Sequence, residues 1–470
     1  MILRRPAQTK ERRKKRKSSK AVVSINPAPN RNMKRLATHT LGCRLNQFET
    51  EKIAEKLGRF RFQRAPFEER ADIYLINTCT VTHKADATCR QIISNVARRK
   101  GDAKLVVVGC YVESDRETVA ALEGVDLVID NKNKSRTDII LRNKWPEMFE
   151  QGTDVACENG GVSEFFGRSR AWLKISDGCN QSCAFCIIPT VRGSLRNNSA
   201  ENVVRDVGRL VNAGYCEVTL TGVHIGHFKD KRAKVGSLCD LLKLLLDKTN
   251  VSRLRISSLE PQVVDKELIR FMAENQNRIC RYLHLPLQSG SNRILGAMRR
   301  PYNRERYLEV TALARSEIPQ VVIGADVIVG FPGETDEDFE YTKKIAESGA
   351  LDYLHVFTYS DRRGTKASQF TDKISPHIVS RRHKTLRKIS TARMNLALKR
   401  SIGSELGAIS ENRDEATSRY WGVTDNYLRI LLPDGIGGDR EIHRVRANSF
   451  SNGVLSAAPK NAPALELSGA

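Results

Sequence analysis

The sequence contains no hydrophobic run long enough to cross a membrane, and the apolar stretch after its basic start is too short for a secretory signal peptide. We therefore expect a cytoplasmic protein with no membrane partner. That compartment is reducing, so the eleven cysteines are not expected to form disulfides. They remain available as metal ligands, nucleophiles or core residues.

Acidic residues are scarce relative to basic ones: 54 Asp and Glu against 78 Lys and Arg give a net charge of +24. About half of this excess lies in residues 1–35, but the rest of the chain is basic as well. A charge of this size favours a polyanionic partner, most simply a nucleic acid. The length of 470 residues allows several domains, and the hydrophobic content of 40% predicts real cores.

The first third of the chain predicts a tail followed by a parallel-sheet domain. Residues 1–33 are basic, have no apolar period and are expected to be disordered. Residues 34–148 alternate strand-like runs (LATHTLGC, DIYLINTC, KLVVVGC) with helical stretches, a pattern typical of a parallel α/β sheet. The expected helices span 47–57, 84–98 and 114–121. Residues 149–167 contain several glycines and are interpreted as a linker.

Residues 168–400 predict a second α/β domain. Six strand-like runs follow one another: AWLKISDG, EVTLTGVHIG, RLRISSLEP, YLHLPLQSG, GADVIVGFPGE and DYLHVFTYS. Amphipathic stretches separate them, and Ser199 and Thr335 are placed to cap two of the helices. Six such units predict a partial (β/α)6 barrel that is open on one side, with its chemistry at the carboxyl ends of the strands. The helix expected at 376–400 carries a basic face.

The remaining residues change character. Within 401–456, the short strand-like runs YLRILLP and EIHRVRA are separated by Gly and Asp, which predicts a small β-barrel. Residues 457–470 are expected to form a loose tail. The overall fold class is therefore α/β with a small all-β module at the end.

Three cysteines stand close together without a fourth. Cys179, Cys183 and Cys186, here called the loop trio, follow the first barrel strand in CxxxCxxC spacing. Structural zinc sites and ferredoxin-type clusters normally take four ligands. Three thiolates in one loop fit a 4Fe–4S cluster with one iron left open to chelate a small molecule. A zinc site is the alternative, and it would need His224 or His227 as its fourth ligand.

The motif CNQSCAFC, with an aromatic residue before its last cysteine, resembles the radical S-adenosylmethionine superfamily. The resemblance implies that the open iron binds S-adenosylmethionine and that an electron from an external donor cleaves it to a 5′-deoxyadenosyl radical. It also implies that TLTGVHIG and ADVIVGFPGE contact S-adenosylmethionine. We expect these contacts from Gly222, Gly330, Gly333 and Glu334. The alternative is that these glycines only form turns.

Three more cysteines each end a predicted strand. Cys43, Cys79 and Cys110, here called the dispersed trio, occur in LGC, NTC and VGC. The carboxyl ends of parallel strands share one edge, so these three side chains are expected to converge. Convergence alone leaves zinc, a cluster and catalysis open. The other five cysteines match no motif and are expected to be core or incidental residues: Cys89, Cys157, Cys216, Cys239 and Cys280.

The flanks TLGCRLNQFETE, INTCTVTHKA and VVGCYVE resemble the N-terminal domain of the methylthiotransferase family. This implies a second 4Fe–4S cluster on the dispersed trio. Members replace a C–H bond by C–S–CH3: one S-adenosylmethionine methylates a sulfur at the auxiliary cluster, and another supplies the radical. TLGCRLNQFETE most resembles the branch acting on threonylcarbamoyladenosine at position 37 of tRNA. The isopentenyladenosine branch typically has GCQMN there, and the ribosomal-protein branch has GCPKN.

The implied function is methylthiolation of carbon 2 of threonylcarbamoyladenosine in the anticodon loop of tRNA, by a monomer. Methylthiolation of isopentenyladenosine and a non-catalytic Fe–S RNA-binding protein are the alternatives. WGVTDNYLRILLP resembles the TRAM domain, a small RNA-binding β-barrel, but SELGAISENRDEATSR is a degenerate version of its usual first strand. Tyr420, Trp421 and Tyr427 could stack on bases. For two of the three, a place in the core is expected.

Overall fold

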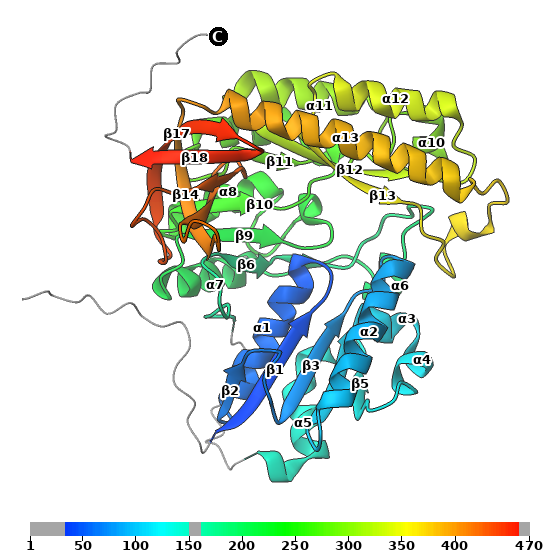
Figure 1. Ribbon diagram of the computed structural model, residues 1–470, viewed down its shortest axis with the longest axis vertical. Helices are drawn as coiled ribbons and strands as arrows, with labels where there is room; N and C mark the ends of the chain where they lie inside the picture. The colour runs from blue at the N-terminus through cyan, green and yellow to red at the C-terminus, as the bar shows by residue number, and fades with distance from the viewer. Residues whose placement is uncertain (1–32, 150–160, 460–470) are drawn as a thin grey trace, which may run out of the picture.

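The computed structural model describes residues 33–149 and 161–459. Most of the expected tails at 1–33 and 457–470, and most of the linker at 149–167, lie outside the described residues. Residues 457–459, expected to belong to the C-terminal tail, instead end the last strand, Val454–Pro459. Figure 1 shows an N-terminal α/β domain below a partial barrel, with a small β-barrel at one end. The expected α/β fold class is confirmed. No helix in the described part of the chain is long and apolar enough to span a bilayer.

The N-terminal domain is a five-stranded parallel sheet in the order β2-β1-β3-β4-β5. All six residues of β3 are buried, as a central parallel strand covered on both faces requires. The strands are β1 (Lys34–Thr40), β2 (Phe62–Ala65), β3 (Ile73–Thr78), β4 (Lys104–Gly109) and β5 (Leu127–Ile129). The helices are α1 (Arg44–Gly58), α2 (His83–Arg99), α3 (Cys110–Ser114), α4 (Arg116–Ala120), η1 (Lys134–Arg136), α5 (Thr137–Lys144) and η2 (Pro146–Met148).

The helix predicted at 114–121 is instead two short helices, α3 and α4. Helix α3 begins at Cys110, directly after β4. Asp115, with a ψ of 70°, interrupts the helical path, and its Oδ1 accepts a hydrogen bond of 3.3 Å from the Thr118 amide as the cap of α4. The capping carboxylate therefore ends one helix and begins the next.

The middle of the chain forms a partial barrel with all six predicted strands. They are β6 (Ala171–Lys174), β9 (Glu217–Thr221), β10 (Arg253–Ile256), β11 (Tyr282–His284), β12 (Val322–Val329) and β13 (Tyr353–Thr358). Two parallel sheets, β10-β9-β6 and β11-β12-β13, are joined by a single parallel bridge between Leu254 and Ile279. Among the described strands no pairing joins β6 to β13, so the barrel is open there.

The helices of this domain include longer ones on the outer face of the partial barrel and short ones in its loops. They are α6 (Ile188–Arg192), α7 (Ala200–Asn212), η3 (Ile225–His227), α8 (Leu238–Lys248), η4 (Pro261–Val263), α9 (Lys266–Glu274), α10 (Asn292–Ala297), α11 (Arg304–Glu317), α12 (Asp336–Glu347), η5 (Lys366–Gln369) and α13 (Pro376–Arg400). Helix α6 contacts α3 of the N-terminal domain. Strand β7 (Ser176–Asp177) follows β6 closely in the sequence and pairs in antiparallel fashion with β8 (Arg196–Asn197). The predicted caps are confirmed: Ser199 accepts from the Asn202 amide, and Thr335 forms a capping box with Asp338.

The C-terminal module is a closed five-stranded barrel in the order β14-β15-β16-β18-β17. Its strands are β14 (Glu405–Arg413), β15 (Tyr420–Thr424), β16 (Arg429–Leu431), β17 (Ile442–Ser451) and β18 (Val454–Pro459). The stretch that looked degenerate in sequence forms β14 and pairs with both β15 and β17. Tyr420 and Tyr427 pack against the core, as expected for two of the three aromatic residues, whereas Trp421 stacks under Arg429.

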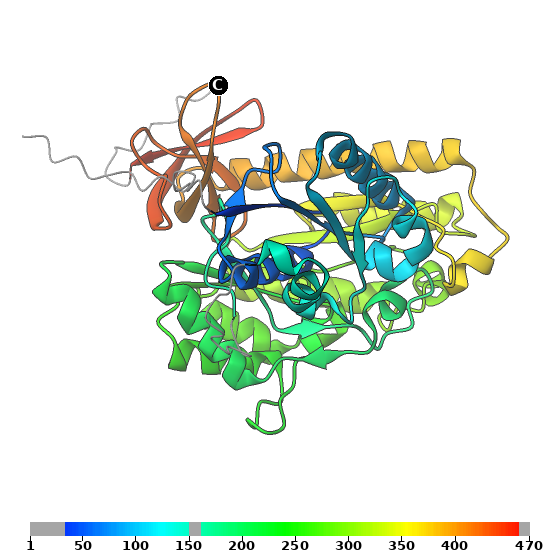
Figure 2. The ribbon, with the colours of Figure 1, turned by 90° about the horizontal axis from the view of Figure 1, so that it is seen from below.

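A buried ionic cluster fixes the C-terminal barrel to the partial barrel. Glu217, at the start of β9, is bound by Arg253 and Arg255 of β10 and by Arg170. Burial alone would raise the pKa of Glu217, but the three arginines hold it well below its ordinary value. The Arg253 Nη1 also donates to the Gly407 carbonyl at 2.6 Å, and the Arg255 Nη2 to the Thr424 carbonyl at 2.9 Å. Helix α13 leads along the partial barrel to this junction (Figure 2).

Candidate functional site: two cysteine trios on neighbouring edges

The sheet brings the dispersed trio together as predicted. Cys43 caps α1 after β1, Cys79 follows β3 and Cys110 follows β4, and these strands are neighbours in the order β1-β3-β4. Burial and, to a smaller extent, the nearby Cys43 and Cys110 thiols raise the pKa of the Cys79 thiol to about 11. Gly42 has a φ of +90°, and a Cβ there would lie 2.8 Å from the Cys79 Sγ. Only glycine allows this close turn beside Cys79.

The loop trio sits after β7, at the carboxyl side of the first barrel strand. The Gln181 amide donates to the Cys179 Sγ at 3.3 Å, and the Arg300 Nη1 donates to the Cys183 Sγ at 3.0 Å. Burial raises the pKa of the Cys186 thiol to about 12, with Cys183 and Cys179 adding to the rise. Bound metal would replace these thiol protons, while the N–H donors would stabilise the thiolates.

The donor sets fit iron–sulfur clusters better than single ions. Among the residues described in the structure, no group of three His, Cys, Asp or Glu side chains is placed to hold one metal ion. A mononuclear zinc site gathers its ligands around one point, whereas a cluster places each cysteine on a different iron. His224 lies near the loop trio, with its Nε2 3.4 Å from the Gln181 Nε2. Burial, His227 and Arg300 lower the His224 pKa to about 4, so its imidazole is neutral at pH 7.

Helix α6 connects the two trios. It begins two residues after Cys186, and Ile187 and Val191 pack with Cys110 in one apolar cluster. The Asn131 Nδ2 donates to the Val191 carbonyl at 2.7 Å and lies 3.6 Å from the Cys110 Sγ. The last cysteine of the loop trio is thus linked through one short helix to the last cysteine of the dispersed trio.

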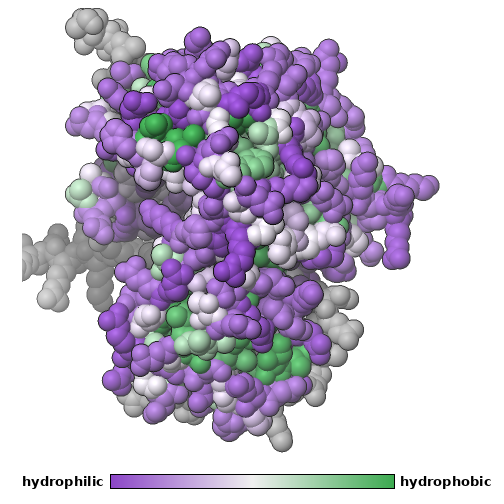
Figure 3. Space-filling model, turned by 90° about the vertical axis from the view of Figure 1, so that its right-hand side faces the viewer, coloured by the Kyte–Doolittle hydropathy of each residue, from purple (hydrophilic) through white to green (hydrophobic). Residues whose placement is uncertain are grey.

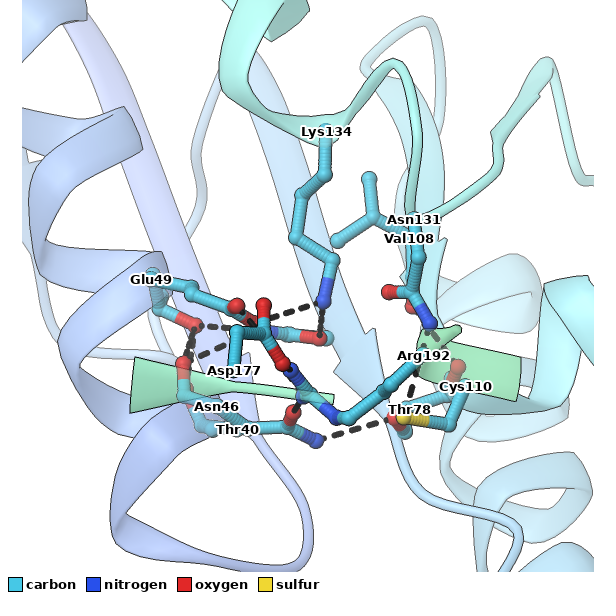
Figure 4. Close-up of polar contacts among 12 residues, drawn as sticks. Thr40, Asn46, Glu49, Thr78, Val108, Cys110, Asn131, Lys134, Asp177 and Arg192 are labelled. Carbon is cyan, nitrogen blue, oxygen red and sulfur yellow. Dashed lines mark hydrogen bonds and ion pairs between the residues drawn. The ribbon is translucent and has the colours of Figure 1, made fainter. Parts of the chain in front are cut away.

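Arg192, at the end of α6, holds the two domains together (Figure 4). Its Nη1 lies 3.1 Å from the Glu49 Oε1 and 3.0 Å from the Asp177 Oδ1, and its Nη2 donates to the Asn46 side chain. Lys134 and Lys174 also bind Glu49, at 2.8 and 3.0 Å. Burial alone would raise the Glu49 pKa, but the three cations hold it well below its ordinary value.

Sequence reasoning missed this network. Asp177 and Arg192 bracket the loop trio in DGCNQSCAFCIIPTVRG, and the pairing of opposite charges across that loop was a usable signal. Nothing in the sequence marks Glu49 as their partner, because α1 reaches them only through the docking of the two domains. A cavity of about 780 Å³ lies beside this network, between α1 and the β7–β8 hairpin, and basic residues outnumber acidic ones in its lining.

The residues expected to contact S-adenosylmethionine lie at the carboxyl ends of barrel strands. Gly222 follows β9, and Gly330 and Gly333 follow β12. The Glu334 carboxylate is buried and is engaged internally: it accepts from the Gly330 amide at 2.8 Å and from the Arg382 Nη1 at 2.6 Å. It therefore shapes the glycine loop. The contacts of these residues with S-adenosylmethionine remain predictions.

The expected basic face of α13 is present in part. Arg382 is buried against Glu334 and Asp336 and does not belong to the surface. The other four cations expected on this face are exposed: Arg381, Lys384, Arg387 and Lys388. The positions of these residues along the helix predicted a basic face. They did not show that the Arg382 side chain is buried in an ion pair with Glu334.

Comparisons with known proteins agree with this architecture. The description "Radical SAM superfamily" matches residues 173–346, and "Uncharacterized protein family UPF0004" matches residues 35–130. A protein of Bacillus subtilis named threonylcarbamoyladenosine tRNA methylthiotransferase MtaB is 35% identical over 85% of this chain and 90% of its own length. A protein of the same name from Aquifex aeolicus is 36% identical over 84% of this chain and 96% of its own.

A third relative carries another name. The tRNA-2-methylthio-N(6)-dimethylallyladenosine synthase of Mycolicibacterium vanbaalenii is 32% identical over 88% of this chain and 84% of its own. The fold and these matches define a radical S-adenosylmethionine enzyme, a transferase. The chain belongs to the methylthiotransferase family within that superfamily. A 4Fe–4S cluster and S-adenosylmethionine as cofactors follow from that membership.

Proposed function

We propose that this protein methylthiolates carbon 2 of threonylcarbamoyladenosine at position 37 of tRNA. The observation that carries the proposal is the linkage of two cysteine trios through α6 and Arg192. An aromatic C–H bond offers no acidic proton, so acid–base catalysis alone does not suffice. The names of the Bacillus and Aquifex relatives support the tRNA substrate and its threonylcarbamoyl group.

Each trio would hold one 4Fe–4S cluster. When bound, the loop-trio cluster would supply the electron that cleaves S-adenosylmethionine, and the auxiliary cluster would supply a sulfur methylated by a second S-adenosylmethionine. The chain's own residues position these groups. Arg300 donates to Cys183, and the positive charge of Arg192 lies close to the Cys43 and Cys110 thiols. Helix α6 sets the spacing between the two trios.

The RNA would be bound mainly through its phosphates. The exposed cations of α13 and the stacked pair of Trp421 and Arg429, whose Cζ is 4.3 Å from the ring centroid, are the proposed contacts. Hydrophilic residues cover most of the face shown in Figure 3, and apolar residues gather there in separate patches. Such a surface suits a polar partner. We expect the affinity for tRNA to fall steeply with salt.

Nucleoside mass spectrometry tests the reaction and the substrate together. Total tRNA from a deletion strain is digested and compared with that of its parent. We expect loss of 2-methylthio-threonylcarbamoyladenosine and accumulation of its unmethylthiolated precursor, both restored by the intact gene. Unchanged amounts of both nucleosides would contradict the proposal.

Isopentenyladenosine is the second candidate substrate, favoured by the name of the Mycolicibacterium relative. The same digest separates the two candidates, because loss of the isopentenyl product alone would replace the first with the second. A non-catalytic RNA-binding role is tested with purified, reconstituted protein. Reductive cleavage of S-adenosylmethionine to 5′-deoxyadenosine would exclude that role.

A further inference from the structure

Arg44 is a half-buried arginine without an acidic partner. It is the first residue of α1, directly after Cys43. Its Nη2 donates to the Tyr427 hydroxyl, and its Cζ lies 5.5 Å from the centroid of the Tyr427 ring. Within residues 33–149 and 161–459, no ion pair joins Arg44 to a carboxylate.

Among the described residues, the fully buried arginines are paired with acids, whereas the half-buried Arg278 donates only to backbone carbonyls. Arg192 binds Glu49, Arg362 binds Asp86 and Arg382 binds Glu334. Withdrawing a guanidinium from water is costly unless an anion compensates. Arg44 therefore has the capacity to bind an anion that comes from outside the chain.

The C-terminal barrel holds the Tyr427 side chain that contacts Arg44. Tyr427 lies in the turn between β15 and β16 and has a φ of 70°, a left-handed conformation that a non-glycine residue rarely adopts. The partial barrel fixes this turn: the Arg281 Nε donates to the Asp425 Oδ2 at 2.6 Å, and the Arg255 Nη2 donates to the Thr424 carbonyl. The Tyr427 ring stacks on Tyr282 at 4.6 Å between centroids.

The space beside Arg44 is open to solvent. Cys43, its neighbour on one side, is exposed, and so is His355 of β13. Although part of its side chain reaches solvent, partial burial lowers the pKa of the His355 imidazole. The charges of His284 and Arg44 also lower it and that of Asp326 raises it, which places Arg44 and His355 near one another. Arg44 therefore lies beside exposed residues of the dispersed trio and of the partial barrel, and it contacts the C-terminal barrel through Tyr427.

We propose that Arg44 binds the carboxylate of the threonylcarbamoyl group, with Tyr427 as its positioning residue. This assignment rests on the proposed function. The threonyl part of that nucleoside ends in a carboxylate, whereas an isopentenyl group is uncharged. The guanidinium of arginine matches a carboxylate with two parallel hydrogen bonds, which combine affinity with orientation. Arg44 would thus select the substrate and orient its base beside Cys43.

The test compares two anticodon stem-loop RNAs that differ only at this carboxylate. One carries threonylcarbamoyladenosine as the free acid, and the other carries its methyl ester. Binding to the reconstituted protein is measured by fluorescence anisotropy, and methylthiolation by mass spectrometry. We expect the wild type to bind the acid about tenfold more tightly than the ester. Arg44→Gln should bind both RNAs with the affinity that the wild type has for the ester.

Further variants separate recognition from folding. Arg44→Lys keeps the charge but loses the planar fork, so it should retain only part of the preference. Tyr427→Phe removes the hydroxyl that holds Arg44 and should reduce the preference while the ring still packs. Arg90→Gln is the matched control: the Arg90 Nη1 donates to the Tyr111 hydroxyl at 2.7 Å in a similar arginine–tyrosine pair. It should discriminate between acid and ester as the wild type does.

The outcomes distinguish this assignment from the proposed function. If the Arg44→Gln variant still binds the free-acid RNA more tightly than the methyl-ester RNA, the proposed role of Arg44 is overturned. Equal weakening of acid and ester binding would overturn it as well, and would assign Arg44 to an RNA phosphate. A wild type that cleaves S-adenosylmethionine but never methylthiolates the acid stem-loop would refute the proposed substrate, and the assignment with it.

Discussion

The loop trio and the dispersed trio bring three cysteines together by opposite routes. Cys179, Cys183 and Cys186 lie within one loop, and neighbouring backbone amides and Arg300 support their sulfurs. Cys43, Cys79 and Cys110 come from three strands and meet only because β1, β3 and β4 are adjacent in the sheet. A local site depends on the conformation of one loop, whereas a dispersed site depends on the order of an entire sheet.

The largest expected effect comes from breaking the loop trio. Cys186→Ala should abolish 5′-deoxyadenosine formation, because the remaining two thiolates cannot hold the cluster that cleaves S-adenosylmethionine. The N-terminal cluster should stay in place. Chromatographic assay of deoxyadenosine together with iron analysis checks both points, and undiminished deoxyadenosine would refute the role of this loop.

Breaking the dispersed trio should separate the two reactions. Cys79→Ala should still form 5′-deoxyadenosine but transfer no methylthio group, because only the auxiliary site is damaged. The measurement is deoxyadenosine and modified nucleoside from the same reaction mixture. Wild-type amounts of product would remove the second cluster from the proposed function.

The link between the trios should matter for stability. Arg192→Gln removes the cation that joins Glu49 to Asp177 and should reduce the free energy of unfolding by about 3–5 kcal/mol. Thermal and denaturant unfolding measure this loss. Glu49→Gln combined with Arg192→Gln should lose less stability than the sum of the two single losses, because both single variants break the same ion pair. An additive loss would contradict the coupling.

The same network predicts a dependence on pH. The folded-state pKa of Glu49 is depressed, so its contribution is fully present above the unfolded value of about 4.3 and is lost as the pH falls through the folded value. Unfolding measured from pH 7 downward should therefore show a smaller acid-induced loss in Glu49→Gln than in the wild type. Parallel curves would show that Glu49 is not coupled to folding in this way.

The smallest effect is expected at a cysteine outside both trios. Cys239 is buried in the core of the partial barrel, with Leu238 and Leu242 in the same cluster. Cys239→Ala should cost about 1 kcal/mol of stability and leave the iron content unchanged. A loss of iron would show that the division between ligand and core cysteines is wrong.

Sequence patterns predicted the features that repeat or lie close together along the chain. The six barrel strands, the capping residues Ser199 and Thr335 and the strand-end positions of the dispersed trio each have a local signal. The docking of the domains has none, because Arg192 finds Glu49 and Arg44 finds Tyr427 only after the sheets have formed. The burial of Arg382 was not predicted for the same reason. Arg382 forms an ion pair with the buried carboxylate of Glu334, which lies in another segment of the chain.

The anchoring of the C-terminal barrel has a consequence for protein engineering. Arg253 and Arg255 donate to the carbonyl oxygens of Gly407, Val423, Thr424 and Asp425, acceptors that belong to the backbone. Replacing the side chains at those positions leaves these oxygens in place wherever the strand path is kept. A foreign barrel of the same backbone can therefore be grafted at this junction without redesigning Arg253 or Arg255, although Arg281 still requires a carboxylate at the position of Asp425. Such chimaeras offer a direct test of whether the barrel sets the RNA preference, with the two cysteine trios left unchanged.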